Sequence, residues 1–236
     1  MILSSAALAA PLLAAAPGGV QEARVFEGEI PKIARLEYLL HLPADYDADG
    51  DASPLILFLH GAGERGDDLE KVKVHGIAKI AEAQADFPFI AVSPQCPTRS
   101  WWTGEVEALE ALLAEVIETH NVDESRVYLT GLSMGGFGSW ALAIRNPSLF
   151  AAIAPVCGGG EPEKVAAIKD LPVWNFHGAK DTVVEPERSQ TMVDALEAAG
   201  GDVKYTLHPE ANHDSWTVTY DNPELYEWFL SHRNVY

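Results

Sequence analysis

Short apolar segments alternate with amphipathic ones along most of the chain. Seven segments have the length and the apolar or β-branched composition of strands: Arg35–Leu42, Pro54–His60, Phe87–Pro94, Arg126–Gly131, Phe150–Val156, Leu171–Gly178 and Val203–Pro209. Several are apolar throughout, which is typical of strands buried on both faces of a parallel sheet. Arg35–Leu42 alternates and carries charge, so we expect it at an edge of the sheet.

The segments between these strands show the spacing of helices. Glu105–His120 has apolar residues on one face and acids on the other, Pro186–Ala199 ends at a Gly-Gly pair, and Asn222–His232 has a proline in its first turn. This alternation predicts an α/β fold, with a mostly parallel central sheet and helices on both faces. Active sites of such sheets lie at the carboxyl ends of the strands.

Length and composition limit the possible organisation and partners. The 236 residues, 47% of them hydrophobic, suffice for one domain with a full core, which we expect over residues 20–236. The formal net charge is −19. This charge disfavours binding of nucleic acid or of an anionic membrane through a basic surface.

The first residues differ from the rest of the chain. Residues 2–16 are apolar and rich in alanine, and they are too short to span a bilayer. The stretch is typical of a secretory signal that ends at Ala14-Ala15-Ala16, so we expect residues 1–19 to be a signal peptide or a disordered N-terminus. The mature protein would then be secreted or periplasmic. Because no Lys or Arg precedes the apolar run, an N-terminal helix of a cytoplasmic protein is the alternative.

Two features bear on metals and disulfides. The acidic loop Pro43–Pro54 resembles the start of a calcium-binding loop but lacks the closing glutamate, so we expect a solvated hairpin. Cys96 and Cys157 form no metal-ligand pattern, and the sequence is compatible with one disulfide or with two buried thiols. We therefore expect no metal site.

The first candidate for chemistry is Ser133, in the sequence Gly-Leu-Ser-Met-Gly at 131–135. It follows the expected strand Arg126–Gly131 and opens a helix of small residues. A sharp strand-to-helix turn strains the serine backbone and exposes its hydroxyl, and only small neighbours such as Gly131 and Gly135 tolerate the close packing. The motif alone is a weak signal, but in this setting it predicts a nucleophile.

A serine nucleophile needs a base, and the chain has eight histidines. His213 lies in a polar loop just past the last strand, where an imidazole can reach Ser133. His60 is expected to shape its own loop, and His177, at the end of a buried strand, to bond the backbone.

The base needs a carboxylate that fixes its tautomer. Asp181 lies in the loop after the strand Leu171–Gly178, and Glu185 is the alternative. The resulting order Ser, Asp, His along the chain is the order found in hydrolase sheets.

An oxyanion hole requires backbone N–H groups beside the nucleophile. Met134 supplies one, and the glycine-rich loop at 60–66 supplies the other, from Ala62 or else Gly63. A phosphate-binding loop is disfavoured because no Gly-x-x-x-x-Gly-Lys is present.

Three tryptophans lie near the expected site. Trp101 and Trp102 follow the strand Phe87–Pro94, and Trp216 comes three residues after His213. Each ring could stack on a sugar or phenolic group of a substrate, or pack inward as core.

Together these motifs resemble the α/β-hydrolase superfamily. The resemblance covers about Arg35 to Phe229, and its most specific segments are LHGAGERG, PQCPTRSWW, YLTGLSMGGFGSW, PVCGGG, FHGAKDTVV and NHDSW. These are similar to the bacterial phospholipase/carboxylesterase group, often labelled predicted peptidases, which is related to feruloyl and polyhydroxybutyrate esterases and to dienelactone hydrolases. The resemblance implies the triad Ser133, Asp181 and His213. Dienelactone hydrolases have cysteine at the position of Ser133, and the chain departs from them there.

Where larger hydrolases insert a cap, only Gly158–Asp170 separates two strands, so we expect an open site. The expected function is that of a serine carboxylesterase that forms an acyl-enzyme from small or polymer-linked esters and needs no cofactor. We expect no membrane insertion of the mature chain, and the oligomeric state is open. The alternatives are a serine peptidase for short peptides and a non-catalytic binding protein on the same fold.

Overall fold

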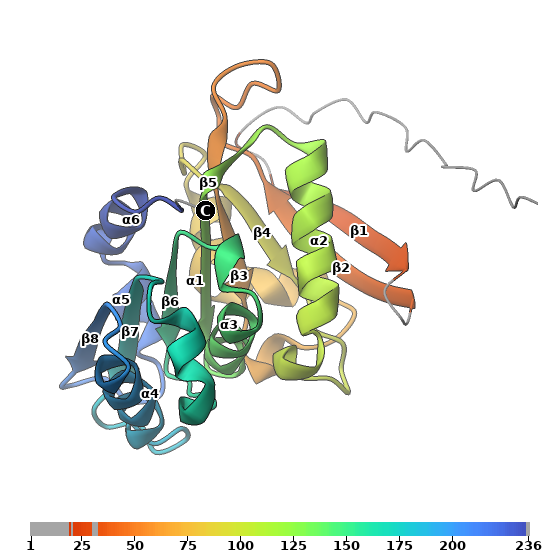
Figure 1. The fold of residues 1–236 in the computed structure, drawn as a ribbon. Helices are drawn as coiled ribbons and strands as arrows, with labels where there is room; N and C mark the ends of the chain where they lie inside the picture. The colour runs from red at the N-terminus through yellow and green to blue at the C-terminus, as the bar shows by residue number, and fades with distance from the viewer. Residues whose placement is uncertain (1–18, 20, 30–32, 235–236) are drawn as a thin grey trace, which may run out of the picture.

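A mostly parallel sheet runs through the molecule and is covered by helices on both faces, as predicted (Figure 1). The computed structural model describes residues 19, 21–29 and 33–234, and in this part the sheet has eight strands in the order β1-β2-β4-β3-β5-β6-β7-β8. Strands β3 to β8 run parallel, whereas β2 is antiparallel to both β1 and β4. The expected signal segment lies outside the described residues.

The strands are β1 (Gln21–Glu29), β2 (Ile33–His41), β3 (Ser53–Leu59), β4 (Ile90–Pro94), β5 (Val122–Leu132), β6 (Ala152–Val156), β7 (Val173–Gly178) and β8 (Val203–His208). The α-helices are α1 (Gly76–Ala83), α2 (Val106–Thr119), α3 (Met134–Arg145), α4 (Glu187–Ala198), α5 (Trp216–Tyr220) and α6 (Pro223–Leu230). Short 3₁₀ helices occupy Ala62–Glu64, Leu69–Val74, Trp102–Gly104, Pro147–Leu149 and Pro162–Ile168.

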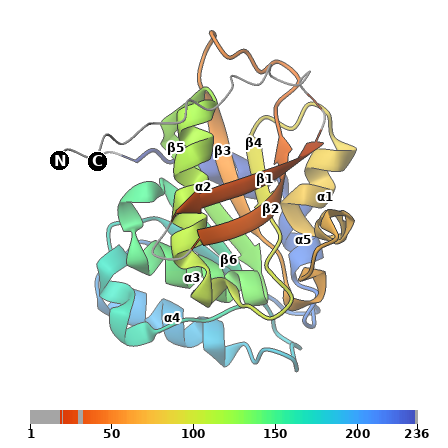
Figure 2. The same cartoon turned by 90° about the vertical axis from the view of Figure 1, so that its right-hand side faces the viewer.

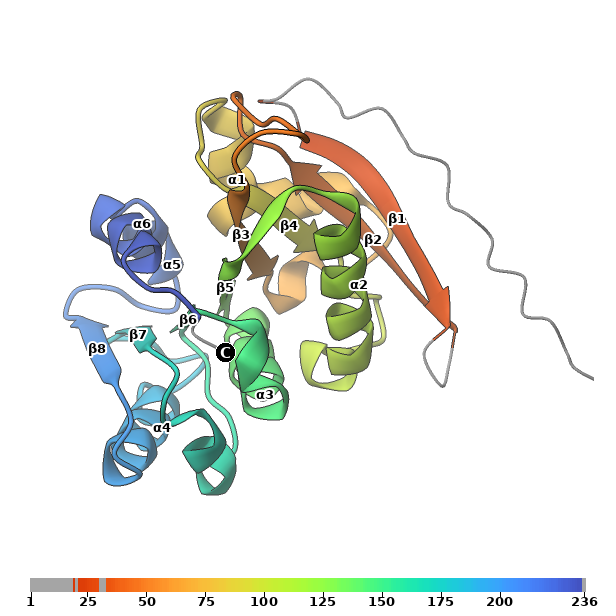
Figure 3. The ribbon, with the colours of Figure 1, turned by 45° about the horizontal axis from the view of Figure 1, so that its top comes forward.

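Each face of the sheet has its own apolar core, and Figure 3 shows the two helical layers. Alternate residues of β3 point to opposite faces, as the pleat of a strand requires. Leu55, Leu57 and Leu59 pack with helices α2, α3 and α4, whereas Ile56 and Phe58 pack with α1, α5 and α6. Among the described residues, no helix combines the length and the apolarity that crossing a bilayer requires.

Two expectations about the amino-terminal half were wrong, and one strand was missed. β2 is not an edge strand, because β1, which the sequence pattern did not predict, lies outside it (Figure 2). The loop Pro43–Pro54 is not a hairpin: β2 and β3 are not neighbours, since β4 lies between them. Most of that loop is exposed, as expected of a solvated segment.

The parallel strands determine where the site forms. Because β5, β6, β7 and β8 point in one direction, the loops that follow them lie at one rim of the sheet. All of the candidate catalytic side chains follow these strands.

Candidate active site

Ser133 occupies a strained turn between β5 and α3. Its φ of 52° and ψ of −114° lie outside the regions that residues with a side chain ordinarily adopt, and α3 begins at the next residue. The Ser133 N–H donates to the carbonyl of Val156 on the neighbouring strand at 2.9 Å. This bond ties the turn to the sheet and leaves the hydroxyl on the partly exposed side.

Glycines permit the turn to form against the sheet. A Cβ atom on Gly135 would lie 1.8 Å from the carbonyl oxygen of Leu59, and one on Gly131 would lie 2.4 Å from the carbonyl oxygen of Gly135. The first turn of α3 therefore rests directly on the carboxyl end of β3. Only glycine fits at these positions, as the motif predicted.

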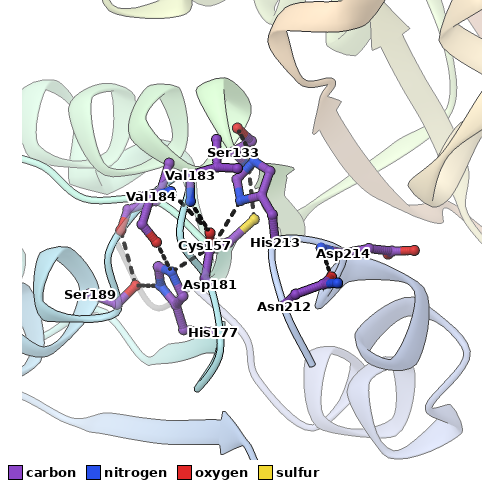
Figure 4. A network of polar contacts seen from close by, with 11 residues as sticks. Ser133, Cys157, His177, Asp181, Val183, Val184, Ser189, Asn212, His213 and Asp214 are labelled. Atoms are coloured by element: carbon purple, nitrogen blue, oxygen red, sulfur yellow. Dashed lines mark hydrogen bonds and ion pairs between the residues drawn. The ribbon is translucent and has the colours of Figure 1, made fainter. Parts of the chain in front are cut away.

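The structure brings Ser133, His213 and Asp181 together (Figure 4). His213 Nε2 lies 3.0 Å from Ser133 Oγ, and His213 Nδ1 lies 2.7 Å from Asp181 Oδ2. The three residues come from the loops after β5, β8 and β7. The side chain of His213 is 20% exposed and that of Asp181 is fully buried, so solvent reaches the imidazole but not the carboxylate.

Asp181 is held as a carboxylate. Burial alone would raise its pKa, but hydrogen bonds from His213 and from the N–H groups of Val184 and Val183 outweigh this effect, and the pKa lies below its usual value. Both backbone N–H groups donate to Oδ1, at 2.8 and 3.0 Å, which leaves Oδ2 for His213. Because the ionised Oδ2 can only accept a hydrogen bond, a neutral His213 must carry its proton on Nδ1. Its Nε2 lone pair then faces the Ser133 hydroxyl.

His60 is tied into its own loop. Its Nδ1 lies 2.6 Å from the Gly61 carbonyl, and its Nε2 accepts from the Cys96 N–H at 2.9 Å. Burial lowers the pKa of His60 to about 4. This imidazole is therefore neutral at pH 7, and both of its nitrogens hydrogen-bond to backbone groups.

The predicted oxyanion donors flank Ser133. Met134 and Ala62 are the first residues of α3 and of a 3₁₀ helix, where N–H groups have no acceptor within the helix. The loop comes close to the serine, because a Cβ on Gly61 would lie 3.8 Å from Ser133 Cβ. Gly63 is exposed, with open space around its Cα. Binding of an oxyanion by these amides remains a prediction.

The adjacent tryptophans have opposite environments. Trp101 is 52% exposed, and the guanidinium of Arg65 lies over its ring, 5.2 Å from the centroid. Trp102 is fully buried, and its Nε1–H donates to the carbonyl of His60 at 2.9 Å. The expectation that Trp102 contacts substrate is therefore wrong, because its buried ring packs against the 60–66 loop and hydrogen-bonds to it.

Trp216 packs against the candidate base. Its ring lies 5.2 Å from the His213 ring and is nearly perpendicular to it, and it lies 5.3 Å from the ring of His75. Trp216 is half-buried. It borders the site through His213, and a contact with substrate remains a prediction.

Cys157 is a neighbour of Ser133 that the sequence pattern did not assign to the site. It follows β6 with a φ of 41°, and the Ser133 N–H lies 3.3 Å from its Sγ. Its position directly after a buried strand could have placed it at this rim. Cys96 and Cys157 are both free and buried, and burial raises the pKa of each thiol to about 12.

Cys157, Asp181 and His213 also offer metal-ligating atoms within 4.8 Å of one another. However, His213 Nδ1 and Asp181 Oδ2 already form a hydrogen bond, and the Cys157 thiol stays protonated at neutral pH. The arrangement therefore fits proton transfer between side chains better than coordination of an ion. Chemically, it can activate a hydroxyl for attack on a carbonyl.

The sequence and the fold of the chain are similar to those of known proteins. Residues 98–224, more than half of the chain, match the sequence profile of the dienelactone hydrolase family, and this region contains Ser133, Asp181 and His213. A bifunctional acetylxylan esterase/xylanase, XynS20E, of Neocallimastix patriciarum is 25% identical over 194 residues, which cover 78% of this chain and 27% of that protein.

Two further similarities are to a depolymerase and to an esterase of known structure. Poly(3-hydroxyalkanoate) depolymerase C of Paucimonas lemoignei is 27% identical over 135 residues, which cover 52% of this chain and 31% of that protein. A crystal structure of a thermostable esterase superposes with a TM-score of 0.79 at 34% identity, covering 90% of this chain and 63% of that one. The matched residues thus span 27% of the acetylxylan esterase/xylanase and 31% of the depolymerase, so the chain covers less than a third of either curated relative.

Proposed function

The chain belongs to the dienelactone hydrolase family, a family of hydrolases whose relatives here include esterases, and we propose that it is a serine carboxylesterase. The observation that carries the proposal is the hydrogen-bond chain from Ser133 Oγ through His213 to Asp181 Oδ2, at 3.0 and 2.7 Å. This chain joins a nucleophile, a base and a carboxylate, the three parts that acyl transfer by serine requires.

The reaction proceeds in two halves. His213 Nε2 takes the proton of Ser133 as Oγ attacks the ester carbonyl, and the Met134 and Ala62 amides donate to the oxygen that gains negative charge. When the tetrahedral intermediate collapses, His213 gives the proton to the leaving alcohol, and an acyl-enzyme remains. Water then repeats the same steps, releasing the acid and restoring Ser133.

Serine rather than cysteine is the proposed nucleophile. The nearest thiol, Cys157, is fully buried, and its pKa of about 12 keeps it protonated at neutral pH. Because dienelactone hydrolases use cysteine at the position of Ser133, we propose hydrolysis of open-chain esters in place of their activity on a cyclic ester, the lactone.

We propose that the substrate is a small ester or an ester attached to a polymer. Between β6 and β7 the chain inserts only residues 157–172, including the 3₁₀ helix Pro162–Ile168, and this segment offers no domain-sized cover for the site. The exposed ring of Trp101 offers a stacking surface for an aromatic acid or a sugar. The names of the relatives suggest acetylated sugars and polyesters as substrates to test.

A panel of chromogenic substrates tests the proposal. It includes acetyl and longer acyl esters, a feruloyl ester, an acetylated xylo-oligosaccharide, a lactone and a peptide amide. We expect hydrolysis of esters and no cleavage of the amide. Ser133→Ala should lower kcat by at least about 10⁴-fold, whereas the matched control Ser148→Ala, at an exposed serine outside the site, should keep it.

The outcomes separate the alternatives. Cleavage of the amide at a rate comparable with the esters would indicate a peptidase. No cleavage of any substrate by the folded protein would favour a binding protein. Full activity in Ser133→Ala would exclude the proposed nucleophile.

A further inference from the structure

The carboxylate of Asp181 contacts a second imidazole, that of His177 (Figure 4). His177 is the fifth residue of β7 and is fully buried. Its Nε2 lies 3.1 Å from Asp181 Oδ2, the same oxygen that accepts from His213, and 2.8 Å from the carbonyl oxygen of Val184. Asp181 Oδ2 therefore lies between two histidines.

The surroundings of His177 determine its tautomer. Nε2 faces two acceptors, the Asp181 carboxylate and the Val184 carbonyl, so Nε2 must carry a proton. Nδ1 lies 2.7 Å from the hydroxyl oxygen of Ser189, which is also fully buried. Because Nε2 carries the proton, Nδ1 of the neutral ring is an acceptor, and the Ser189 hydroxyl can donate its proton to it.

We propose that His177 is a positioning residue: held by Ser189 and Val184, its Nε2–H orients the Asp181 carboxylate toward His213. The proposal rests on the proposed function, since it assigns a role within that triad. Backbone N–H groups of Val183 and Val184 fix Oδ1, and His177 supplies the second donor to Oδ2. The carboxyl group is thereby prevented from rotating about its Cβ–Cγ bond.

The charges around His177 are consistent with this role. Burial lowers the pKa of His177, despite the opposing effects of the Val184 carbonyl and of the Asp181 charge, and His213 acts in the same direction as burial. His177 is therefore neutral at pH 7 and donates one hydrogen bond to the carboxylate. If it takes a second proton in acid, Ser189 can accept from Nδ1 and donate to the Gly158 carbonyl, 3.0 Å from its Oγ.

Two amide substitutions of His177 test separately its contact with Asp181 and its contact with Ser189. His177→Gln places an amide group near the position of Nε2, and its N–H can still donate to Asp181. His177→Asn places its amide near Nδ1, where it reaches Ser189 but not Asp181. The fully buried His41, whose Nε2 lies 3.3 Å from the Phe87 carbonyl at the opposite rim, supplies the control His41→Asn.

We expect His177→Asn to lower kcat by about tenfold, with KM changed by less than about twofold, because a lost hydrogen bond to a charged group is of this size. The acid limb of its kcat/KM profile should move to higher pH, since an oxygen with one donor fewer holds a proton on the Asp181–His213 pair more readily. His177→Gln and His41→Asn should retain the wild-type acid limb.

Equal loss of activity in both His177 variants without a shift of the acid limb would overturn the proposal in favour of simple packing. Unchanged activity and profile in a folded His177→Asn would overturn it as well.

A measurement on the wild-type protein covers the case in which His177→Asn does not fold. In protein labelled with ¹⁵N-histidine, NMR shifts distinguish the two neutral tautomers, and the spectrum of His177→Gln identifies the His177 signals. The Nε2–H tautomer supports the proposal, and the Nδ1–H tautomer overturns it. This readout needs no substrate, so a protein that hydrolyses no ester would refute the proposed function while the role of His177 is still decided.

Discussion

The candidate nucleophile and its neighbour Cys157 both have a strained backbone conformation. Ser133 and Cys157 are the non-glycine residues with positive φ in the described part of the chain, and they follow the neighbouring strands β5 and β6. Each such conformation costs on the order of 1–3 kcal/mol. The bond from the Ser133 N–H to the Val156 carbonyl holds the first turn, and the bond from the Cys157 N–H to the Phe176 carbonyl holds the second. The sheet thus maintains the conformation that exposes the Ser133 hydroxyl.

The adjacent tryptophans should respond differently to truncation. Trp101→Ala removes an exposed ring and should change the free energy of unfolding by less than about 1 kcal/mol. Trp102→Ala removes a buried ring and its hydrogen bond to His60, and should cost about 3–5 kcal/mol. Urea denaturation of the two variants measures both values.

Substrate preference provides a second readout for Trp101. If its ring stacks on substrates, Trp101→Ala should raise KM for feruloyl or sugar esters by about threefold to tenfold and leave small acetate esters unchanged. An equal change for all esters would contradict a stacking role.

At the scale of single residues, the sequence predicted which catalytic side chains follow the strand ends. It did not predict which way side chains within the loops point. Ser133, Asp181 and His213 each follow a parallel strand, so the rule for strand ends is enough to place them at one rim. Trp101 and Trp102 are neighbours in a loop, where no periodicity says which ring points inward. The contacts that His177 makes through Ser189 join residues on β7 and α4, and no local pattern indicates them.

Among the contacts between elements, that of α3 with β3 leaves the least room for an added side-chain atom. Gly135→Ala would place a Cβ 1.8 Å from the backbone oxygen of Leu59, and neither the helix nor the strand can move without disturbing the sheet. We expect a loss of stability of at least about 3 kcal/mol, or failure to fold.

The matched control is Gly104→Ala, because a Cβ at Gly104 would come no closer than 3.9 Å to Ser100 Oγ. Its thermal midpoint should stay within about 3 °C of wild type. A stable Gly135→Ala variant with normal activity would show that the turn adapts more easily than the contact suggests.

Most of the strands that the sequence pattern identified have a continuous apolar run. β3 to β7 are mostly buried on both faces and were all predicted, whereas the side chain of Phe26 is the only buried one in the described part of β1. β1 is mostly charged or polar, and its adjacent apolar residues Val25 and Phe26 interrupt any alternation, so its sequence carries little strand signal. Without β1, the charged and alternating β2 was expected at the edge.

For the molecule as a whole, we expect the buried histidines to lower stability as the pH drops from 6.5 to about 4. The pKa of buried His60 is about 4 in the folded state, below the ordinary 6.5, so in this window the unfolded chain binds a proton that the folded protein does not. At pH 4 this difference amounts to about 3 kcal/mol for His60. Burial also lowers the pKa values of His41 and His177, which adds to the loss in the same direction.

Urea denaturation at several pH values between 4 and 7 measures this slope. The variant His60→Asn lacks the titrating group, so its free energy of unfolding should depend less steeply on pH. The difference in slope should correspond to the uptake of about one proton on unfolding. Equal slopes for wild type and His60→Asn would mean that His60 is not held neutral.

The charge of −19 should make the fold sensitive to salt. Self-repulsion of 35 acidic against 16 basic residues destabilises the compact state at low ionic strength, and salt screens it. Many ion pairs are exposed, such as Arg35 with Glu27 at 3.7 Å, and their screening costs little. We expect the thermal midpoint at pH 7.5 to rise by several degrees, about 3–8 °C, between low salt and about 0.5 M KCl.

The same measurement near the isoelectric point, about pH 4.6, is the control. There the net charge is close to zero, so added salt should change the midpoint much less. A rise of equal size at both pH values would point to a general effect of salt on apolar surface.

The concealment of both sulfhydryls has a practical use. Cys96 and Cys157 are buried and protonated at neutral pH, so maleimide reagents should spare them while the protein is native. One cysteine introduced at an exposed position, for example in place of Val183 beside the triad, would then take up a fluorophore or spin label alone. Binding of an ester or of an inhibitor could be followed from that position without first replacing either natural cysteine.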